Sequence, residues 1–221
     1  MSKTLFISKN IAELGELRTY SDLHELQLIS TSFLEFLPIS FTLTESYDVI
    51  FFGSPRAVMF FKANGDIPKS KLIASVGEKT MRLLESMGHE VAFSGKANHS
   101  ISEVADDFKD WLKDRKALFP ISSRSLGTIS KSIPARQKVL IECYETKVSG
   151  KEIPPCDYYV FTSPSNVEGF FQKNKLPEKS IVVAWGESTA ASIQKAGAAY
   201  DGVLQEPSIE CLIDYLQKFS A

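Results

Sequence analysis

The sequence predicts an α/β fold of two similar domains, each with a parallel sheet covered by helices, joined by a two-stranded β linker. Short apolar runs rich in aromatic and β-branched residues alternate with amphipathic stretches, as in parallel sheets whose crossover helices cover both faces. One strand-to-helix motif occurs twice, and both copies keep the same spacing to the motifs that follow them. Two long extended segments bracket the first copy, which indicates the linker.

The repeated motif is an acidic residue, an apolar strand and a Ser-Pro turn, at residues 48–55 and 157–164. Serine is a good helix N-cap, and proline is tolerated at the first helical position because its missing N–H needs no partner there. Each copy therefore predicts a buried strand that turns directly into a helix. The unpaired backbone N–H groups and the positive dipole end of such a helix suit an anion.

The two copies are separated by 157 − 48 = 109 residues. Gly77 and Gly186, each followed by a glutamate, lie 186 − 77 = 109 residues apart. Gly88 and Gly197 lie 197 − 88 = 109 residues apart. Several motifs that keep one register indicate an internal repeat.

Length and composition are those of a globular protein, with 221 residues of which 43% are hydrophobic and 24% charged. The formal net charge of −2 gives no broad attraction to nucleic acid, which we do not expect as a partner. No apolar run approaches the roughly 20 residues that span a bilayer, and the N-terminus lacks a signal-peptide pattern. We therefore expect a cytoplasmic protein that does not bind a membrane.

The three cysteines, Cys143, Cys156 and Cys211, have neither disulfide nor zinc-site spacing, and we expect small buried apolar residues. The three histidines also lack ligand spacing, and we expect them at the surface. The sequence indicates no metal site and no cofactor.

The pattern along the chain predicts a strand over 4–8, a helix from Ile11 to Leu26, and an extended stretch over 28–36 that is either a strand or a connection to another body. The remaining strands are expected at 47–52, 72–76, 90–93, 117–121, 138–148, 157–161, 181–184 and 200–204. The remaining helices are expected at 55–63, 77–84 and 101–113, near 130, and after 163, 186 and 208.

The second repeat has fewer strands than the first, and the N-terminal strand and helix would make the two bodies comparable. We therefore expect one domain of residues 1–33 plus 150–221, in which the N-terminal segment packs with the C-terminal half. The other domain is expected at 38–138. Residues 28–37 and 139–149 are expected to form the β linker.

Ligands of open α/β sheets gather outside the carboxyl ends of the strands. The loops expected there are rich in Ser, Thr and Gly, which fits a ligand with several carboxylates or phosphates. The candidate binding residues are Ser54, Arg56, Gly77, Lys79, Thr80, Ser122, Ser123, Arg124, Ser163, Ser165, Asn166, Gly186, Ser188 and Thr189. Any one of these loops is equally compatible with a simple cap or turn, but all of them together, in two halves, favour a binding cleft.

The sequence has none of the glycine-rich nucleotide-binding, nucleophile-elbow or zinc-protease motifs. Catalysis would then depend on hydroxyls, helix dipoles and an acid. Tyr144 is the candidate, because it is a polar-tipped aromatic in the extended segment between the two bodies. It is equally compatible with an ordinary strand tyrosine whose ring is half buried.

Five motifs stand in an order that is typical of one family: the strand-Ser-Pro elements at 51–58 and 161–167, Gly77-Glu78-Lys79-Thr80, Gly186-Glu187-Ser188-Thr189 and Tyr144-Glu145-Thr146. In these motifs, over essentially its whole length, the chain resembles the uroporphyrinogen-III synthase family. The resemblance implies the two-domain fold described above, in a monomeric enzyme that needs no cofactor.

The resemblance also implies a hydro-lyase of tetrapyrrole (haem) biosynthesis. Its substrate is hydroxymethylbilane, a linear tetrapyrrole with eight carboxylates, and its product is uroporphyrinogen III, formed with inversion of ring D and loss of water. The family's tyrosine matches Tyr144, which we expect to donate a proton or orient the substrate. Lys9 stands where the family often has an arginine, and keeps the charge without the bidentate fork.

Two other functions remain open from the sequence. A non-catalytic, two-lobed protein would bind a polycarboxylate ligand such as a tetrapyrrole without turnover. A plain interaction protein would show no thermal shift with carboxylate-rich ligands. Formation of the type III isomer from hydroxymethylbilane distinguishes the enzyme from both.

Overall fold

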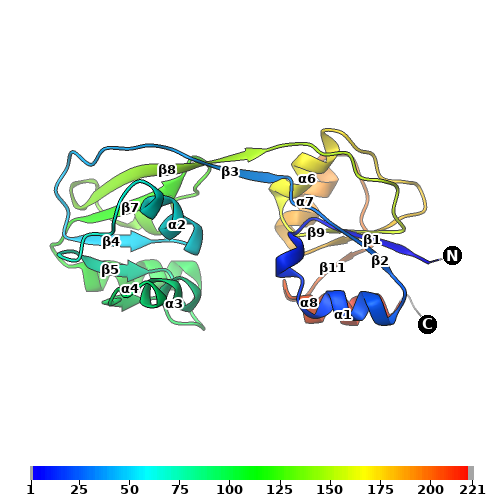
Figure 1. Cartoon of the computed structure of the whole chain (residues 1–221), viewed down its shortest axis with the longest axis horizontal. Coiled ribbons are helices and arrows are strands. Elements are labelled where there is room, and N and C mark those ends of the chain that lie inside the picture. Colours follow the sequence, from blue (N-terminus) through cyan, green and yellow to red (C-terminus); the bar gives the residue numbers. More distant parts are fainter. Residues whose placement is uncertain (1, 219–221) are drawn as a thin grey trace. The chain divides into compact units, whose positions relative to one another are not determined.

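The computed structural model describes residues 2–218, which fall into two units. Unit 1 consists of Met1–Glu35 and Lys147–Ala221, and unit 2 of Phe36–Thr146. Figure 1 shows the blue N-terminal and the red C-terminal elements within one unit and the green middle of the chain in the other. Residue 1 and residues 219–221, which the predicted domain bounds include, lie outside the described residues.

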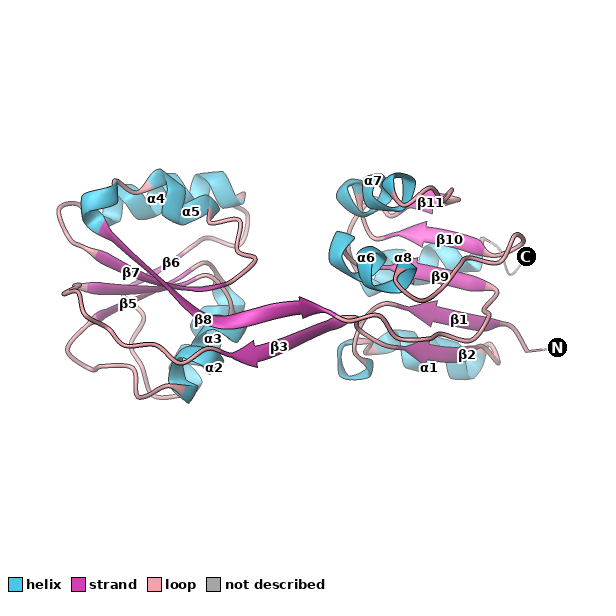
Figure 2. Ribbon diagram, turned by 90° about the horizontal axis from the view of Figure 1, so that it is seen from above, coloured by secondary structure: helices cyan, strands magenta, loops and turns pink. Residues whose placement is uncertain are grey.

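Unit 1 contains a five-stranded parallel sheet in the order β11-β10-β9-β1-β2, seen face-on in Figure 2. The N-terminal strand β1 lies between β9 and β2. The elements of unit 1 are β1 (Thr4–Ile7), the 3-10 helix η1 (Ile11–Glu13), α1 (Glu16–Leu23), β2 (Gln27–Ser30), β9 (Tyr158–Phe161), α6 (Pro164–Phe171), β10 (Ile181–Ala184), α7 (Glu187–Lys195), β11 (Gly202–Val203) and α8 (Ile209–Gln217).

The second sheet, in the order β3-β8-β7-β4-β5-β6, lies in unit 2 except for residues 34–35 of β3 and 147–148 of β8, which belong to unit 1. Its strands from β8 to β6 are parallel. The elements of unit 2 and this sheet are β3 (Leu34–Pro38), β4 (Val49–Phe52), α2 (Pro55–Ala63), β5 (Leu72–Ser75), α3 (Glu78–Ser86), β6 (Phe93–Ser94), α4 (Ile101–Leu112), β7 (Ala117–Ser122), α5 (Thr128–Ser132), the 3-10 helix η2 (Ala135–Gln137) and β8 (Lys138–Val148).

Helices cover both faces of each sheet, which is why the central strands are apolar throughout. In unit 2, Ile50 and Phe52 pack with α2 and α3, whereas Val49 and Phe51 pack with α4 and α5. Figure 2 shows these two helix pairs on opposite sides of the sheet. In unit 1, α1 and α8 cover one face and α6 and α7 cover the other.

The paired motifs have nearly the same backbone conformation in both units. Ser54 has φ −169° and ψ 158°, and Ser163 has φ −164° and ψ 157°. Both hydroxyls accept a hydrogen bond from the backbone N–H three residues later. Gly88 and Gly197 end their helices with φ of 82° and 80°, in the left-handed region that glycine adopts most readily. These angles confirm the internal repeat, and the two parallel-dominated sheets confirm the predicted fold class.

The predicted helix from Ile11 to Leu26 is wrong in its extent. The chain forms η1 and α1 instead, separated by Gly15, whose φ of 44° interrupts a regular helix. The strands predicted at 90–93 and 200–204 form only as the two-residue edge strands β6 and β11, at Phe93–Ser94 and Gly202–Val203.

The extended stretch at 28–36 is two strands with a break between them. Its first part is β2, which pairs with β1 in the sheet of unit 1. The early part of β8 likewise pairs with β7 in the sheet of unit 2, from Lys138 to Tyr144. Residues 28–30 and 139–144, assigned to the linker from sequence, therefore belong to the sheets, because their backbone groups find partners there.

Asn166 joins three segments at the carboxyl edge of the unit 1 sheet. Its side-chain amide donates to the Ser8 carbonyl oxygen over 2.9 Å, and its carbonyl oxygen accepts from the Phe33 backbone N–H over 3.0 Å. The Asn166 side chain is buried, at 4% exposure. Without it the Phe33 N–H would lose its partner in the interior, whereas the Ser8 carbonyl oxygen would keep the Thr162 hydroxyl, which donates to it over 2.6 Å.

We expect Asn166→Ala to lower the free energy of unfolding by about 1–3 kcal/mol, because it leaves the buried Phe33 N–H unpaired. Urea unfolding measures this. Asn64→Ala is the matched control, since the Asn64 amide bonds two backbone carbonyls but is exposed, and its loss should change stability by less than about 1 kcal/mol. Equal losses for both variants would contradict the role assigned to Asn166.

Candidate active site

The strand order of unit 2 reverses at β4. The chain moves outward from β4 through β5 to β6, and its next strand, β7, lies on the other side of β4. Such a reversal separates the loops that leave neighbouring strands and opens a crevice at their carboxyl ends, where ligands of open α/β sheets bind. A cavity of about 360 Å³ lies at this position in unit 2.

The cavity has apolar walls and a few polar groups. Phe51 and Phe119, from the two strands at the reversal, contribute to the apolar part. The polar side chains at the cavity include Ser54, Ser122 and Tyr144, three of the residues that the sequence analysis selected. Apolar walls with a few placed polar groups are typical of small-molecule sites.

Ser54 forms the junction between β4 and α2. Its hydroxyl accepts a hydrogen bond from the Ala57 backbone N–H over 3.1 Å, and Pro55 opens the helix. The cap thus uses the N–H of Ala57, Pro55 has no N–H, and the Val58 N–H bonds to the Ser54 carbonyl. The N–H of Arg56 is the one that the first turn leaves for a ligand. The positive end of the α2 dipole therefore lies beside the cavity.

Tyr144 reaches the cavity because β8 contains a bulge. Ile121 pairs with Glu142, but Ser122 pairs with Tyr144, so one residue of β8 is left over. The Tyr144 side chain is 7% exposed, and its ring stacks on Phe60 with centroids 4.8 Å apart. The Tyr144 hydroxyl forms no hydrogen bond with any residue between 2 and 218. The ring is therefore fixed by packing, whereas the hydroxyl keeps its hydrogen-bonding capacity for a ligand.

The strand order of unit 1 also reverses, between β1 and β9. Here the side chain of Asn166 bridges the two strand ends through the Ser8 carbonyl. The equivalent residue of unit 2 is Ala57, since 166 − 57 = 109, and Ala57 lines the cavity. An alanine methyl group cannot make the bridge, so unit 2 keeps space where unit 1 has a hydrogen-bonded contact.

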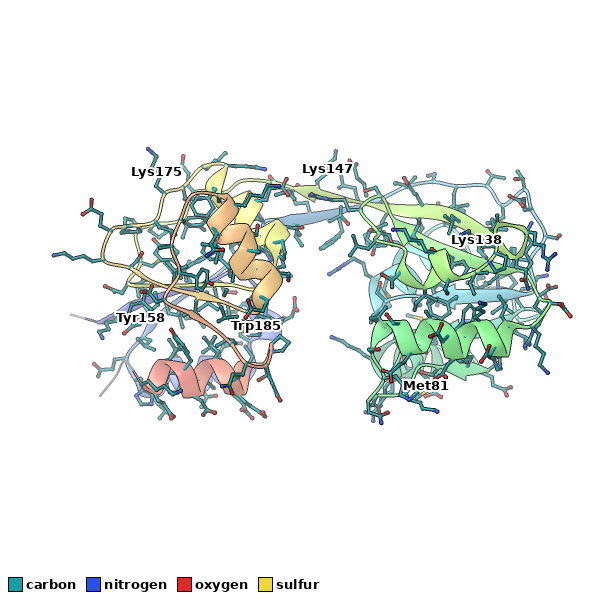
Figure 3. The ribbon with its side chains drawn as sticks, turned by 180° about the vertical axis from the view of Figure 1, so that it is seen from behind. Met81, Lys138, Lys147, Tyr158, Lys175 and Trp185 are labelled. Atoms are coloured by element: carbon teal, nitrogen blue, oxygen red, sulfur yellow. The ribbon has the colours of Figure 1, made fainter. Side chains whose placement is uncertain are left out.

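Lys9 follows β1 at the carboxyl edge of unit 1. Its ammonium lies 3.4 Å from a Glu13 carboxylate oxygen and 5.6 Å from the centroid of the Trp185 ring. Trp185 precedes Gly186, the N-cap of α7, so Lys9 is a cation close to the start of a second helix. Figure 3 shows Trp185 and Tyr158 at opposite edges of this unit, with Trp185 at the carboxyl edge.

The structure places the candidate residues in two groups, one in each unit. The group in unit 2 is Ser54, Arg56, Gly77, Lys79, Thr80, Ser122, Ser123, Arg124 and Tyr144. The group in unit 1 is Lys9, Ser163, Ser165, Asn166, Gly186, Ser188 and Thr189. The side chains of Thr80, Asn166 and Thr189 are buried within their units, at 1%, 4% and 3% exposure.

Two exposed large apolar residues at the cavity were not expected from the sequence. Leu126 is 80% exposed and Ile101 is 49% exposed, and both line the cavity. A leucine inside the otherwise polar stretch 122–128 is the one sequence signal for the first. Nothing in the sequence indicates that Ile101 lines a cavity, because the first residue of an amphipathic helix can face either the core or the solvent.

His99, which was expected at the surface, is only partly exposed, with 20% of its side chain accessible. Its Nδ1 atom is buried and lies 2.9 Å from a carboxylate oxygen of Asp107, because the loop before α4 folds back on that helix. No group of His, Cys, Asp or Glu within residues 2–218 could hold a metal ion.

Two of the three thiols are buried and are poor nucleophiles. Burial raises the pKa of the Cys143 thiol to about 11, and burial likewise raises that of Cys156 to about 11. Cys143 directly precedes Tyr144, yet its thiol packs into the core on the face that α2 and α3 cover. The thiols therefore offer no thiolate for catalysis near neutral pH.

The chain matches a family model described as Uroporphyrinogen-III synthase HemD over residues 22–214. The chain belongs to the uroporphyrinogen-III synthase family. Members of this family act on a small-molecule substrate, as hydro-lyases of tetrapyrrole biosynthesis. Nothing in the comparisons favours a non-catalytic binding protein.

Two solved structures share the fold. The crystal structure of uroporphyrinogen-III synthetase from Helicobacter pylori 26695 has a TM-score of 0.69 at 16% identity, over 99% of this chain and 100% of that one. A mutant uroporphyrinogen III synthase from the extremely thermophilic bacterium Thermus thermophilus has a TM-score of 0.58 at 11% identity, over 99% of both chains. No protein with a curated description matches the chain in sequence. Within residues 2–218, every helix is too short or too polar to cross a membrane.

We expect iodoacetamide at pH 8 to modify Cys211 much faster than Cys143 or Cys156. A thiol with a pKa near 11 is about one-thousandth ionised at pH 8, and the thiolate is the reactive form. Mass spectrometry of a time course measures the order. The raised pKa keeps both thiols protonated until the pH approaches 11. The difference in modification rate between Cys211 and the two buried thiols should therefore narrow only in strong base or in urea. Rapid modification of native Cys143 would contradict the packing described above.

Proposed function

We propose that this chain cyclises hydroxymethylbilane to uroporphyrinogen III, with inversion of ring D and loss of water. The observation that carries the proposal is the family match over residues 22–214. The cavity at the strand reversal of unit 2 adds a site with the apolar walls and hydroxyls that this chemistry needs.

Backbone N–H groups at helix starts are the proposed ligands of the substrate carboxylates. In unit 2 these are the start of α2 after Ser54 and the start of α3 after Gly77, with Lys79 nearby. Unit 1 offers a second set at Ser163 and Gly186. Helix starts bind anions through the dipole and the unpaired N–H groups, and they need no net positive charge on the protein.

The unit 2 cavity is proposed to hold one end of the substrate. Its volume of about 360 Å³ lies near the lower limit of pockets that enclose a drug-sized ligand, so four substituted pyrroles do not fit inside it. A single terminal ring suits the walls, because Phe51, Phe119 and Ile101 present apolar surface to a flat aromatic. Positioning of that ring would bring its substituents to the polar groups at the cavity.

Tyr144 is the proposed proton donor or orienting group. In the first step the terminal hydroxyl leaves as water and an azafulvene forms, and a hydrogen bond from an acid assists the departure. The azafulvene then closes to a spiro intermediate that rearranges with ring D inverted. A phenol is a weak acid near neutral pH, so we assign most of the rate enhancement to the folded arrangement of the substrate.

The oligomeric state, the location and the binding partners of the enzyme are also proposals. We propose a monomeric enzyme of the cytosol that works without a cofactor and binds neither nucleic acid nor membrane. The net charge of −2 supports the statement on nucleic acid, and the absence of a long apolar run supports the statement on membranes.

Incubation with freshly prepared hydroxymethylbilane, followed by separation of the product isomers, tests the function. We expect mainly the type III isomer. The uncatalysed reaction gives type I, so a product of type I alone would refute the cyclase and leave a tetrapyrrole-binding protein as the remaining candidate.

We expect Tyr144→Phe to lower kcat by about tenfold to a hundredfold, without abolishing turnover, because it removes only the hydroxyl. Tyr47→Phe is the matched control: Tyr47 belongs to the same core and is also 7% exposed, but it does not line the cavity. Steady-state kinetics of both variants measure the effect. Unchanged kinetics for Tyr144→Phe would remove Tyr144 from the mechanism.

A further inference from the structure

Arg56 presents an unpaired guanidinium at the start of α2. Its guanidinium carbon lies 3.5 Å from the centroid of the Phe36 ring, and the residue is exposed. No residue from 2 to 218 forms an ion pair or a side-chain hydrogen bond with it. By contrast, Arg82 on the next helix pairs with Glu78. A guanidinium stacked on a ring keeps its N–H donors around its edge, where a carboxylate accepts two of them in parallel.

The position of Arg56 opposes the helix dipole. A cation in the first turn faces the positive end of the helix, and α2 has no acidic residue in that turn to offset it. The equivalent residue of unit 1 is Ser165, since 165 − 56 = 109, so the repeat itself does not require an arginine. An anion bound at Arg56 would interact favourably with both the guanidinium and the dipole.

Arg56 and its aromatic support adjoin the cavity. Ser54 and Ala57, on either side of it in the chain, both line the cavity. Phe36 also contacts Tyr144, whose ring centroid lies 6.2 Å from its own, in an edge-to-face arrangement. The Phe36 ring therefore contacts both the unpaired guanidinium of Arg56 and the buried ring of Tyr144, whose hydroxyl lacks a partner.

We infer that Phe36 is a positioning residue: its ring holds the Arg56 guanidinium as a bidentate clamp for one carboxylate of the substrate ring in the cavity. The inference rests on the proposed function and specifies it further. Phe36 supplies a flat face that orients the guanidinium, and Arg56 supplies the charge and the two donors. An ordered clamp binds more tightly than a free arginine side chain, because the side-chain entropy is lost before the substrate arrives.

Equilibrium binding of uroporphyrin III, a stable porphyrin with eight carboxylates, measures the clamp without turnover. We expect Arg56→Met to weaken binding and raise KM by about tenfold, with kcat changed by less than about twofold, as for loss of one charged hydrogen-bonding group. Arg56→Lys should restore only part of the affinity, because an ammonium lacks the fork. Arg82→Met, which removes the same charge elsewhere in unit 2, should leave both values unchanged.

Phe36→Leu should raise KM and the dissociation constant by about threefold to tenfold, whereas Phe36→Tyr should keep the wild-type values, because it retains the ring face. Phe41→Leu is the matched control for loss of an aromatic from the same core. Phe41 packs on Phe61 with ring centroids 5.3 Å apart. The ring on which the Arg56 guanidinium stacks is that of Phe36, so Phe41→Leu leaves this contact in place. Phe41→Leu should lower the Tm without changing affinity.

The double variant Phe36→Leu with Arg56→Met separates positioning from a merely structural role. If Phe36 acts through Arg56, Phe36→Leu has little further effect on affinity once Arg56 is removed, so the two changes are not additive. Additive effects, or an unchanged affinity in Phe36→Leu, would overturn the inference. If the type III isomer is not formed but Arg56 and Phe36 still set the affinity for uroporphyrin III, the clamp stands and the proposed cyclisation fails.

Discussion

Both units depend on one hydrogen bond, from a backbone N–H in the first turn of a helix to the serine hydroxyl at the end of a buried strand. It runs from Ala57 to Ser54 in unit 2 and from Asn166 to Ser163 in unit 1, over 3.1 and 3.3 Å. The cap lets an apolar strand end abruptly and turn into a helix that covers the sheet. Because the strands are parallel, every such turn lies at the same edge of its sheet, and the helix starts gather there.

The two copies use this edge differently. In unit 1 the Asn166 side chain bonds the end of β1 and the segment that leads into β3, so the edge is held by buried hydrogen bonds. In unit 2 the equivalent Ala57 cannot form such bonds, and the space becomes a cavity. A duplicated fold thus supplies one edge whose strand ends are joined by buried side-chain hydrogen bonds and one whose strand ends border a cavity.

The sequence predicted the fold class, both serine caps and the repeat, because each depends on residues close together in the chain. It failed where a neighbouring segment decides the outcome. The predicted helix at 11–26 is interrupted at Gly15, whose φ is 44°. The stretch at 28–36 is two strands, since β2 pairs with β1 and β3 pairs with β8. Ser54, Ser122 and Tyr144, which were selected from the sequence, all line the cavity, but Leu126 at the cavity and the contact of Phe36 with Arg56 were not foreseen.

By itself, the sequence establishes two repeats of strand, cap and helix, and a set of hydroxyl-rich loops suited to carboxylates. It does not establish which loops meet. Phe36, Arg56 and Tyr144 come together only through pairing of β3 with β8 and packing of α2 on the sheet. The reason is physical: a cap needs partners three residues away, whereas a stacked guanidinium and a cavity need side chains from strands distant in the chain.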